Sequence, residues 1–434
     1  MKKHIIILAC ILFSYPIFSQ ETIVISQAQL LETISSQNID LLIARQDVRQ
    51  AEIEIDKLKQ STLPDINIGY TASSTNNPLM AFGTKLNQEI VQASDFDPAL
   101  LNDPAAIQNF NAQLNVRHSL VNWEMSHFKE AAQFGVNALQ YNTQRKKDYL
   151  LLMASQYYVD LQLAYRSLDV LESSLQLAME NKRIAQNSFD QGFLQKPDLL
   201  ALDLRVNEIK NRIQFKETEI KKISNALKVM YNKYELGDIK PADSLQILEK
   251  EALTSYDLSG RSDFKALESQ IKAVDKEIAG QRAGSLPRVF VFGNYQINND
   301  AVFNQPGDGY MMGLSLSWNL LGRIKNSATI ESKNIEKLKI NYQYESMKNQ
   351  ASLDIENVQY MMEDARVSIE LARDAILQSR ESLRIRSERF EQGMEKTSDL
   401  LEAEKNLDLA QMNYYKAIAN YNKAFHYMNF LTKN

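Results

Sequence analysis

The segment FDQGFLQKPDLL at residues 189–200 is followed later in the chain by FEQGMEKTSDLL at residues 390–401. Each copy has an aromatic residue three positions before a glycine and an aspartate six positions after it. Beyond both turns, apolar or small residues recur in alternating steps of three and four, and all but one position of 198–230 repeat the pattern of 399–431. This spacing is typical of helices that lie along one another. The chain is therefore predicted to be a tandem duplication of a long helical hairpin, which suggests a ring-like or stacked assembly.

Residues 1–20 have the parts of a secretory signal peptide: two lysines, an apolar run over 5–13 and a cleavage site at 18–20. Cleavage there would remove two lysines and no acidic residue, so the formal charge would move from −5 to −7. Cys10 is the only cysteine, and the residues before it faintly resemble a lipoprotein site, so its lipidation stays an open alternative. A mature chain without cysteine excludes disulfides and thiolate metal sites.

Composition also excludes several classes of function. No stretch after the leader approaches the roughly 18 consecutive apolar residues of a membrane-spanning helix, so the exported protein is soluble or meets a membrane by another route. A pI near 5.7 argues against a nucleic-acid partner. The sequence has no phosphate-binding glycine loop, no HExxH motif and no nucleophile elbow. The mature histidines are scattered over separate elements, so we expect no metal site, no cofactor and no enzymatic activity: His118, His127 and His426.

The first repeat, residues 21–232, is predicted to begin with a helix over 24–60. Apolar and polar residues then alternate along two runs, which predicts a β-hairpin over 65–123. A long helix follows from Trp123 to about Phe189, and at about 1.5 Å per residue it is close to 100 Å long. A tip turn near residue 192 and a return helix complete the repeat.

The second repeat, residues 261–434, has the same order. A helix is predicted over 262–284, and the Leu-Pro pair that follows it echoes the pair before the first hairpin. A β-hairpin over 287–320, a long helix, a tip turn near 393 and a return helix come next. The segment 233–260 between the repeats is predicted to be an irregular connecting, equatorial segment, because it contains a glycine, a proline and a polar mixture.

Four strands of about ten residues, each apolar on one face only, are typical of a barrel in a bilayer. Four strands cannot close a barrel, since about eight are the practical minimum, and an open edge is not tolerated in lipid. The subunits must therefore oligomerise. A dimer would give eight strands and no channel, whereas a trimer would give twelve strands around a water-filled lumen, so a homotrimer is the better prediction.

Three other interpretations remain open at this stage. A soluble helical protein could carry the two hairpins on its surface. A pore-less periplasmic coiled-coil spacer would need the helices but would have no use for strands with an alternating apolar face. An exported enzyme would need a saturable pocket, for which the sequence offers no motif.

The chain resembles the TolC-type outer membrane factors, the exit ducts of Gram-negative efflux and type I secretion systems. The resemblance covers essentially the whole mature sequence and rests on the Leu-Pro before each first strand and on the Phe-x-x-Gly turn followed by Asp-Leu-Leu. The family's Pro-Leu-Phe-x-Gly-Gly motif after the strands is degraded here, at 119–124 and 319–322. The resemblance implies a mainly α fold: four transmembrane strands per subunit, a twelve-stranded barrel in the trimer, and a periplasmic α-barrel of twelve helices.

What the resemblance implies for function is an outer-membrane location with a large periplasmic extension. The duct would conduct substrates passively from the periplasm or from an inner-membrane pump of RND or ABC type. Its partners would be that pump, a periplasmic membrane-fusion adaptor protein and outer-membrane lipid. Neither the substrate (drug, metal or protein) nor the particular pump can be inferred, because substrate choice resides mainly in the pump.

By motif position the resemblance places Asp399 and Glu402 at the periplasmic aperture, where three copies of each would attract cations. Asp198 occupies the matching place in the first copy, and each aspartate could instead cap its return helix. The family's closed state also uses a tyrosine three residues before the tip glycine and a basic residue two after it. Phe390 and Glu395 stand there, so the family's lock cannot be copied to this chain.

Two surfaces complete the sequence-based expectations. The tips Gly192-Phe193-Leu194 and Gly393-Met394-Glu395 resemble adaptor-docking surfaces, although their apolar side chains could also fold back onto their own hairpins. Aromatic residues near the strand ends fit a girdle at the bilayer interface: Tyr70, Trp123, Tyr295, Tyr310 and Trp318. The loop at 76–111 is expected outside the cell, as a cap over the barrel mouth or in pairing between subunits.

Overall fold

The computed structural model describes residues 22–234, 237–248, 258–302 and 307–433. The expected signal peptide with Cys10, and part of the connecting segment at 249–257, lie outside these residues. The chain divides into two units. The sheet unit comprises residues 45–142 and 262–346, and the hairpin unit comprises the described parts of 1–44, 143–261 and 347–434.

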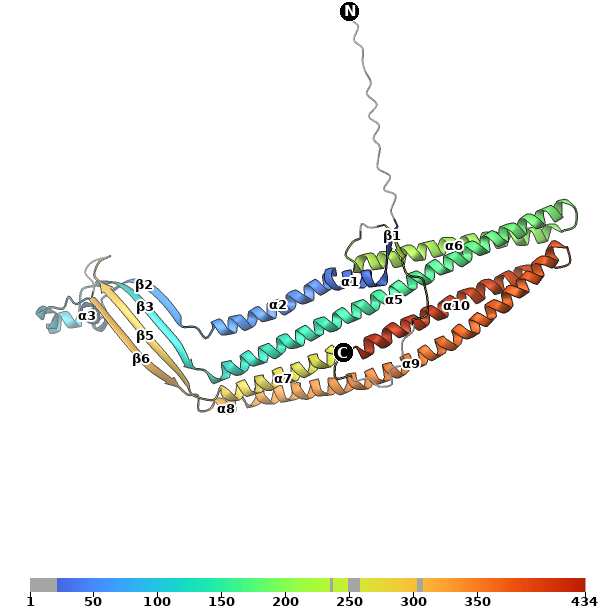
Figure 1. Ribbon diagram of the computed structural model, residues 1–434. Coiled ribbons are helices and arrows are strands. Elements are labelled where there is room, and N and C mark those ends of the chain that lie inside the picture. Colours follow the sequence, from blue (N-terminus) through green and yellow to red (C-terminus); the bar gives the residue numbers. More distant parts are fainter. Residues whose placement is uncertain (1–21, 235–236, 249–257, 303–306, 434) are drawn as a thin grey trace, which may run out of the picture. The chain divides into compact units, whose positions relative to one another are not determined.

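The sheet unit contains one antiparallel sheet in the order β2-β3-β5-β6 (Figure 1). Its strands are β2 (Asp65–Thr75), β3 (Ile107–Val121), β5 (Arg288–Asn299) and β6 (Gly307–Ser317). The register aligns Ile68 with Leu114, Leu114 with Tyr295, and Tyr295 with Tyr310, so apolar side chains form continuous rows on one face. The outer edges of β2 and β6 pair with no other described strand.

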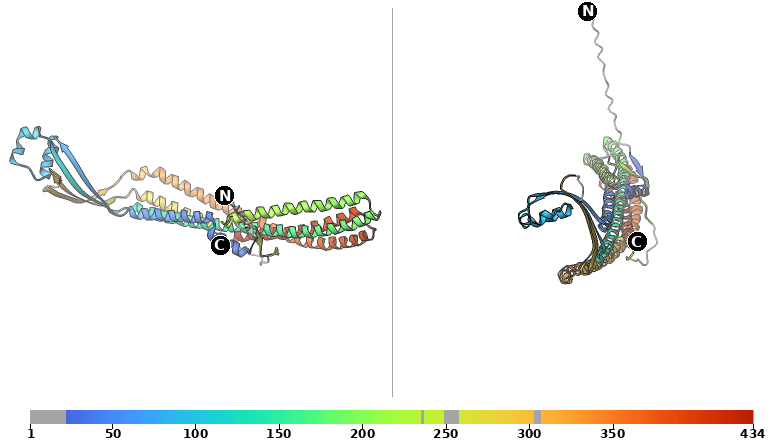
Figure 2. Two further views of the ribbon diagram at one scale, coloured as in Figure 1. Left: turned by 90° about the horizontal axis from the view of Figure 1, so that it is seen from above. Right: turned by 90° about the vertical axis from the view of Figure 1, so that its left-hand side faces the viewer.

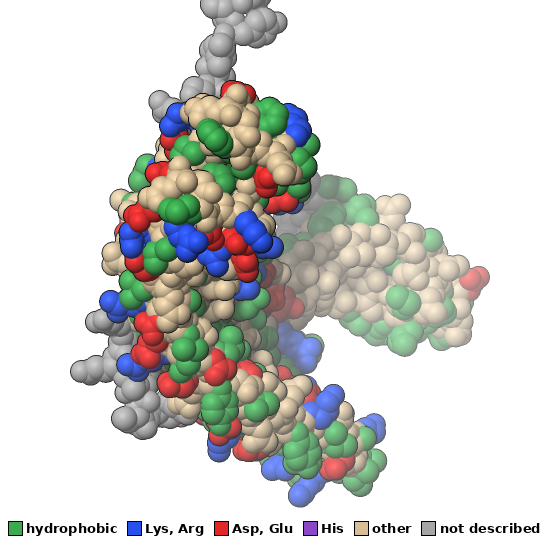
Figure 3. All heavy atoms as spheres, turned by 90° about the vertical axis from the view of Figure 1, so that its right-hand side faces the viewer, with side chains coloured by type: hydrophobic (Ala, Val, Ile, Leu, Met, Phe, Trp, Pro, Cys, Tyr) green, Lys and Arg blue, Asp and Glu red, His purple; other side chains and the backbone are tan. Residues whose placement is uncertain are grey.

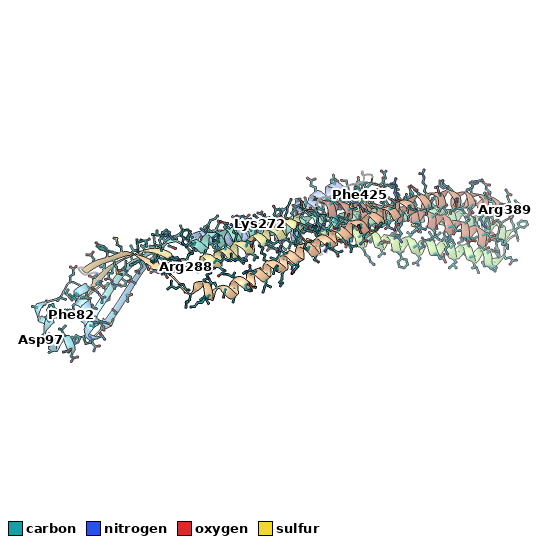
Figure 4. The ribbon with its side chains drawn as sticks, turned by 90° about the horizontal axis from the view of Figure 1, so that it is seen from below. Phe82, Asp97, Lys272, Arg288, Arg389 and Phe425 are labelled. Atoms are coloured by element: carbon teal, nitrogen blue, oxygen red, sulfur yellow. The ribbon has the colours of Figure 1, made fainter. Side chains whose placement is uncertain are left out.

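Helices lead into and out of these strands: α2 (Ile39–Gln60) precedes β2, α7 (Ser262–Ala283) precedes β5, and the short α8 (Gly322–Lys325) follows β6. Arg288, at the first position of β5 and labelled in Figure 4, forms a 2.6 Å ion pair with Glu124 near the start of α5 (Trp123–Asp190). This pair ties the start of one strand to the helix that leaves its neighbour β3.

Two helices of unusual length run through both units, α5 (Trp123–Asp190) and α9 (Ser327–Glu391). Each ends in the same turn, because Gly192 and Gly393 adopt positive φ angles of 83° and 73°. At the first tip, the amide of Phe193 donates to the carbonyl of Ser188, and the amide of Gly192 donates to that of Phe189. This pair of bonds is a Schellman motif, in which glycine is favoured because a left-handed backbone strains other residues.

The hairpin unit consists of two antiparallel helix pairs, α5 with α6 (Lys196–Met230) and α9 with α10 (Thr397–Thr432). Their seams are filled by aliphatic side chains, as the spacing of three and four predicts. Around α5 the unit adds α1 (Gln27–Gln37) and a parallel pair of short strands, β1 (Ile23–Ile25) and β4 (Ile239–Pro241). The buried hydroxyl of Tyr158 fixes this addition by donating to the carbonyl of Ile25 at 3.0 Å.

Three local expectations need correction. The helix expected over 24–60 is preceded by β1 and broken at Asn38, whose side-chain oxygen accepts from the amides of Asp40 and Leu41 and starts a new helix. The connecting segment expected to be irregular contains β4, which is too short to show a period. The long loop of the first hairpin contains three short helices, α3 (Pro78–Asn87), η1 (Ala93–Phe96) and α4 (Pro98–Asn102).

Candidate membrane surface and periplasmic gate

The sheet has one apolar face that is open to the surroundings. On the edge strands Ile68 is 81% exposed and Leu314 is 71% exposed, and on the central strands Leu114 and Tyr295 of the same face are 37% and 42% exposed. A water-facing sheet of this composition would lose the free energy of burying these side chains, about 25 cal/mol for each Å². A hydrocarbon solvent removes that cost, so this face has the chemistry of a lipid contact.

The opposite face of the sheet carries amide side chains in register. Asn67, Asn115 and Asn294 align across three strands, and the amide of Asn294 donates to the side-chain oxygen of Asn115 at 2.6 Å. Further along, Asn298 accepts from both Asn109 and Asn111. This polar face suits a water-filled lumen, because each amide that lacks a protein partner can bond to water.

The predicted girdle residues occupy both ends of the apolar face. Tyr70, Tyr295 and Tyr310 lie in two adjacent rows of the sheet toward its loops, and the hydroxyl of Tyr295 donates to Asp308 at 3.1 Å. Trp318 follows β6 at the other end and donates from its indole nitrogen to the carbonyl of Ser285, while Trp123 begins α5. The strand between Tyr310 and Trp318 is about 27 Å long. Tilted by about 35–45°, as the strands of such barrels are, it would rise about 20 Å across an apolar band about 25 Å tall.

Other kinds of site find no support in the described part of the chain. None of the helices there combines the length and the apolar composition of a membrane span. The same residues contain no group of three or more His, Cys, Asp or Glu side chains placed to hold a metal ion. His118, His127 and His426 lie on β3, α5 and α10 respectively.

The hairpin unit contains a buried cluster of charged and polar side chains that the sequence analysis missed. Arg205 of α6 contacts Glu404 and Asp408 of α10, with nitrogen–oxygen distances of 3.4 and 2.5 Å. From α5, Asn181 donates to Glu404 at 2.6 Å and the hydroxyl of Ser174 donates to Asp408. Three helices from both hairpins therefore meet in one hydrogen-bonded cluster, which we call the inter-hairpin cluster.

The electrostatics of this cluster are dominated by burial. Desolvation raises the pKa of the Glu404 carboxyl, and it outweighs the hydrogen bond from Asn181 and the attraction of Arg205, which act in the opposite direction. Losing one partner would leave a charge without compensation in an apolar seam. A signal for the cluster was present in the sequence, since Glu404 and Asp408 are four residues apart and adjoin the seam residues Ala403 and Leu407.

The structure places the predicted aperture residues in different surroundings. Asp399 is partly exposed. Its carboxylate accepts a hydrogen bond from the hydroxyl of Ser398 at 3.1 Å, and the guanidinium of Arg386 lies 3.8 Å from it. Glu402 is exposed on α10. Phe390 is buried in the apolar cluster that joins the two hairpins near their tips, so its side chain fills a core and lines no surface.

The positions at which α6 and α10 begin show whether the two aspartates are the N-cap residues of these helices. The N-cap of α6 is Gln195 and that of α10 is Lys396, so Asp198 and Asp399 both lie in the first turn and cap neither helix with a side chain. Acidic residues in a first turn still interact favourably with the helix dipole.

Glu395 makes its own ion pairs at the second tip, in place of the family's basic residue. Its carboxylate lies 3.1 Å from Arg386 and 3.1 Å from Arg389, both in the preceding helix α9. Its side chain is largely covered in this arrangement. The charge at this position is therefore neutralised within one hairpin, and the bridge between hairpins is made farther along α10 by the inter-hairpin cluster.

The tips differ in how much apolar surface they leave open. Phe193 is 84% exposed and Met394 is 59% exposed, whereas Leu194 packs against the cluster that contains Phe390. Figure 3, which faces the hairpin end, shows hydrophobic side chains among acidic and basic ones there. Arg389 lies at this end in Figure 4. Two of the three apolar tip residues thus remain uncovered, and the third folds back.

Comparison with known proteins agrees with this geometry. The family model described as outer membrane efflux protein matches residues 254–429, which include most of the second repeat. No curated protein matched the sequence. A solved structure of CusC, in a study of transmembrane channel formation, is similar with a TM-score of 0.80 and 17% identity, over 94% of this chain and 92% of that chain.

Two further solved structures cover the same share of this chain. The outer membrane protein VceC from Vibrio cholerae has a TM-score of 0.74 at 15% identity, over 94% of this chain and 95% of that chain. The CmeC outer membrane channel from Campylobacter jejuni has a TM-score of 0.76 at 15% identity, over 94% and 85%. The resemblance to TolC-type outer membrane factors is thereby confirmed: the second repeat matches the outer membrane efflux protein family, and nearly the whole chain has the fold of outer-membrane channel subunits.

Proposed function

We propose that this protein is the outer-membrane exit duct of a tripartite efflux or type I secretion system. It conducts substrates passively from the periplasm, or from an inner-membrane pump, to the outside of the cell. The observation that carries the proposal is the sheet, which has an open apolar face, an amide-lined polar face and two unpaired edges. A pore-less spacer has no use for such a sheet, and the matching family consists of channels and not of enzymes.

The open edges of β2 and β6 support a homotrimer. Lipid offers no hydrogen bonds to an edge strand, so the edge of each sheet must pair with a neighbouring copy. Three sheets of four strands close a barrel of twelve, whose polar faces line the lumen and whose apolar faces and aromatic girdles contact outer-membrane lipid. The helical hairpins then extend into the periplasm.

The hairpin tips are the proposed docking surface for a periplasmic membrane-fusion adaptor protein, which would link the duct to an inner-membrane pump of RND or ABC type. Phe193 and Met394 support this role, because exposed apolar side chains at helix turns are favourable only when a partner covers them. The substrate of the duct is set by that pump and is not part of the proposal.

The proposed aperture is formed by Asp399 and Glu402 at the start of α10. Three copies of each carboxylate near the axis would attract cations and make the constriction cation-selective. Asp399→Ala with Glu402→Ala should then raise single-channel conductance and weaken block by divalent cations. Asp198→Ala tests separately the matching place in the first hairpin, which is also a candidate aperture position. Unchanged current and unchanged block in the double variant would remove the aperture assignment.

The experiment that tests the proposed function is planar-bilayer conductance of the detergent-extracted protein, with the oligomer mass measured on the same sample. Small cation-selective steps from a trimer are expected. A water-soluble monomer that gives no steps would overturn the proposal and favour the spacer, with the strands as ordinary surface hairpins.

A further inference from the structure

The loop of the first β-hairpin is a folded layer held by its own contacts. Helices α3 and η1 are joined by a 2.7 Å ion pair between Lys85 and Asp95 and by an edge-to-face contact of Phe82 with Phe96, whose ring centroids are 5.5 Å apart, and α4 follows directly after η1. Asn77 caps α3 by accepting from the amide of Met80. Phe82 and Asp97, both in this loop, are labelled near each other in Figure 4. We call residues 77–104 the outer segment.

The outer segment is anchored to the polar face of the sheet. The side chain of Gln88 is only 4% exposed, and its amide donates to the carbonyl of Gln108 at 2.7 Å, to the side chain of Asn109 at 3.0 Å and to the carbonyl of Asn299 at 2.9 Å. Asn109 and Asn111 lie on the same face as Asn115, since side chains alternate along β3. The contact made by Gln88 therefore lies on the amide-lined side of the sheet.

The anchor also reaches the last strand. A Cβ atom at Gly307, the first residue of β6, would lie 2.2 Å from the carbonyl oxygen of Asn87, so only glycine allows this approach. The outer segment thus leaves edge strand β2, rests on the ends of β3 and β5, and touches β6 at the opposite edge. In the view along the sheet end, α3 lies to one side of the strands (Figure 2, right).

The outer segment also presents apolar side chains that nothing in the described chain covers. Leu79 is 83% exposed, and Met80, Leu86, Ile90, Phe96 and Leu100 are exposed as well. A folded layer that fixes its own core yet leaves this much apolar surface open is typical of an interface. Because the segment is anchored on the polar face, the partner that it meets must also lie on the lumen side.

We propose that the outer segments of three copies pack against one another through these apolar side chains and form a seal over the outer mouth of the barrel. This inference rests on the proposed trimeric duct, in which every polar face is directed toward the common axis. On the lumen side, each outer segment faces the outer segments of the neighbouring copies at the same height along the barrel axis. The seal is a second barrier, separate from the periplasmic aperture, and it must part when substrate leaves.

Cysteine cross-linking tests the proposal, because the expected mature chain has no cysteine of its own. Leu79→Cys should yield a covalent dimer within the purified trimer on treatment with a short bifunctional maleimide, with the third subunit left unlinked. Leu314→Cys is the matched control: it is an equally simple change at an exposed leucine on the lipid-facing side of the sheet, and it should not link.

Single-channel recording gives a second readout. Gln88→Ala removes the anchor and should raise conductance at least about twofold, because an apolar constriction excludes water and ions until it opens. Met312→Ala, at an exposed position on the lipid-facing side of β6, should leave conductance unchanged. A trimer that conducts but shows no Leu79→Cys dimer and no change with Gln88→Ala would overturn the seal and leave the duct intact.

Two further results separate the possible failures. Quenching of a fluorophore at Leu79→Cys by nitroxide-labelled lipid would show that the outer segment contacts the bilayer, which also overturns the seal. Absence of trimers and of conductance in the unaltered protein would overturn the proposed function itself.

Discussion

The two hairpin tips close with the same Schellman turn, around Gly192 in the first and Gly393 in the second, but the side chains around the turns differ in charge. An offset of 201 residues aligns Glu395 with Leu194, Arg386 with Ala185, and Arg389 with Ser188. Both tips therefore share the apolar cluster that contains Phe390, and the second tip adds the ion pairs of Glu395.

The same offset explains how the two hairpins of one chain recognise each other. Arg205 aligns with Asn406, Glu404 with Asp203, and Asp408 with Asn207. The first hairpin supplies the cation of the inter-hairpin cluster and the second supplies both anions. Two identical hairpins could not pair in this one-directional way, so divergence after duplication has given each hairpin a distinct place.

The largest expected effect comes from breaking this complementarity. Arg205→Met leaves Glu404 buried without its cation and Asp408 with only the distant Arg212, 4.0 Å away, and should destabilise the protein by about 3–5 kcal/mol. Thermal unfolding in detergent measures it. Lys182→Met is the matched control, because Lys182 pairs with Asp203, the counterpart of Glu404, at a partly exposed site. There the loss should stay under about 1 kcal/mol. Equal losses of stability in both variants would show that the inter-hairpin cluster stabilises the protein no more than the partly exposed ion pair does.

A second comparison concerns His426, which is Asn225 in the first copy. Burial lowers the pKa of His426 to about 4, and its ring lies 3.1 Å from the side chain of Gln27. As pH falls below 6.5 the unfolded chain takes up a proton that the folded chain refuses, so stability is lost down to pH 4. The loss amounts to about 3 kcal/mol.

Melting temperatures across this pH range measure that loss. His426→Asn, the residue of the first copy, should flatten the profile between pH 6.5 and 4. A variant profile that still falls as steeply as the parent's would assign the pH dependence to other groups.

A smaller effect is expected from converting the second tip into the first. Glu395→Leu removes both ion pairs but leaves Arg386 and Arg389 with access to water, so stability should change by no more than about 1 kcal/mol. The ion pairs of the unaltered second tip should also weaken in high salt. Hydrogen exchange at both tips, in low and high salt, should show the larger salt response at the second tip, and a reduced one in Glu395→Leu, where Arg386 keeps only Asp399, 3.8 Å away.

The smallest effect on stability is expected at the exposed tip residues. Phe193→Ser and Met394→Ser remove no buried contact, so each should alter stability by less than about 0.5 kcal/mol. If the tips dock an adaptor, Phe193→Ser should weaken that binding by about tenfold, and more than Met394→Ser, because aromatic anchors dominate such interfaces. Site-specific cross-linking to the adaptor in cells measures it. Equal cross-linking in both variants and the parent would show that neither Phe193 nor Met394 contributes to docking.

Much of the fold follows from the sequence because long periods are averaged over many residues. The seams of α6 and α10 and the alternation along β2 and β6 each repeat often enough to survive single exceptions such as Lys216 in α6. Short elements escaped, since β1, β4 and the helices of the outer segment contain too few residues to show a period. Their positions depend on distant partners, as when Ile23 pairs with Ile239.

Site residues were harder to predict for a related reason. Arg205, Glu404 and Asp408 are ordinary helix residues until the two hairpins are side by side, and only then does burial make their charges matter. Phe390 is the opposite case: its motif position suggested a role at the aperture, whereas its neighbours place its side chain in an apolar core. The turns at Gly192 and Gly393 could be found because their chemistry is entirely local.

The edges of β2 and β6, which pair with no other described strand, have a consequence for how the proposed duct is made. A single subunit cannot enter the hydrocarbon with two rows of free amide and carbonyl groups, so insertion and association must occur together. The rate at which channels appear should therefore rise steeply with the number of subunits in the periplasm. At low expression the limiting species is an unassembled subunit with an apolar sheet in water, which makes such cells dependent on periplasmic chaperones and proteases.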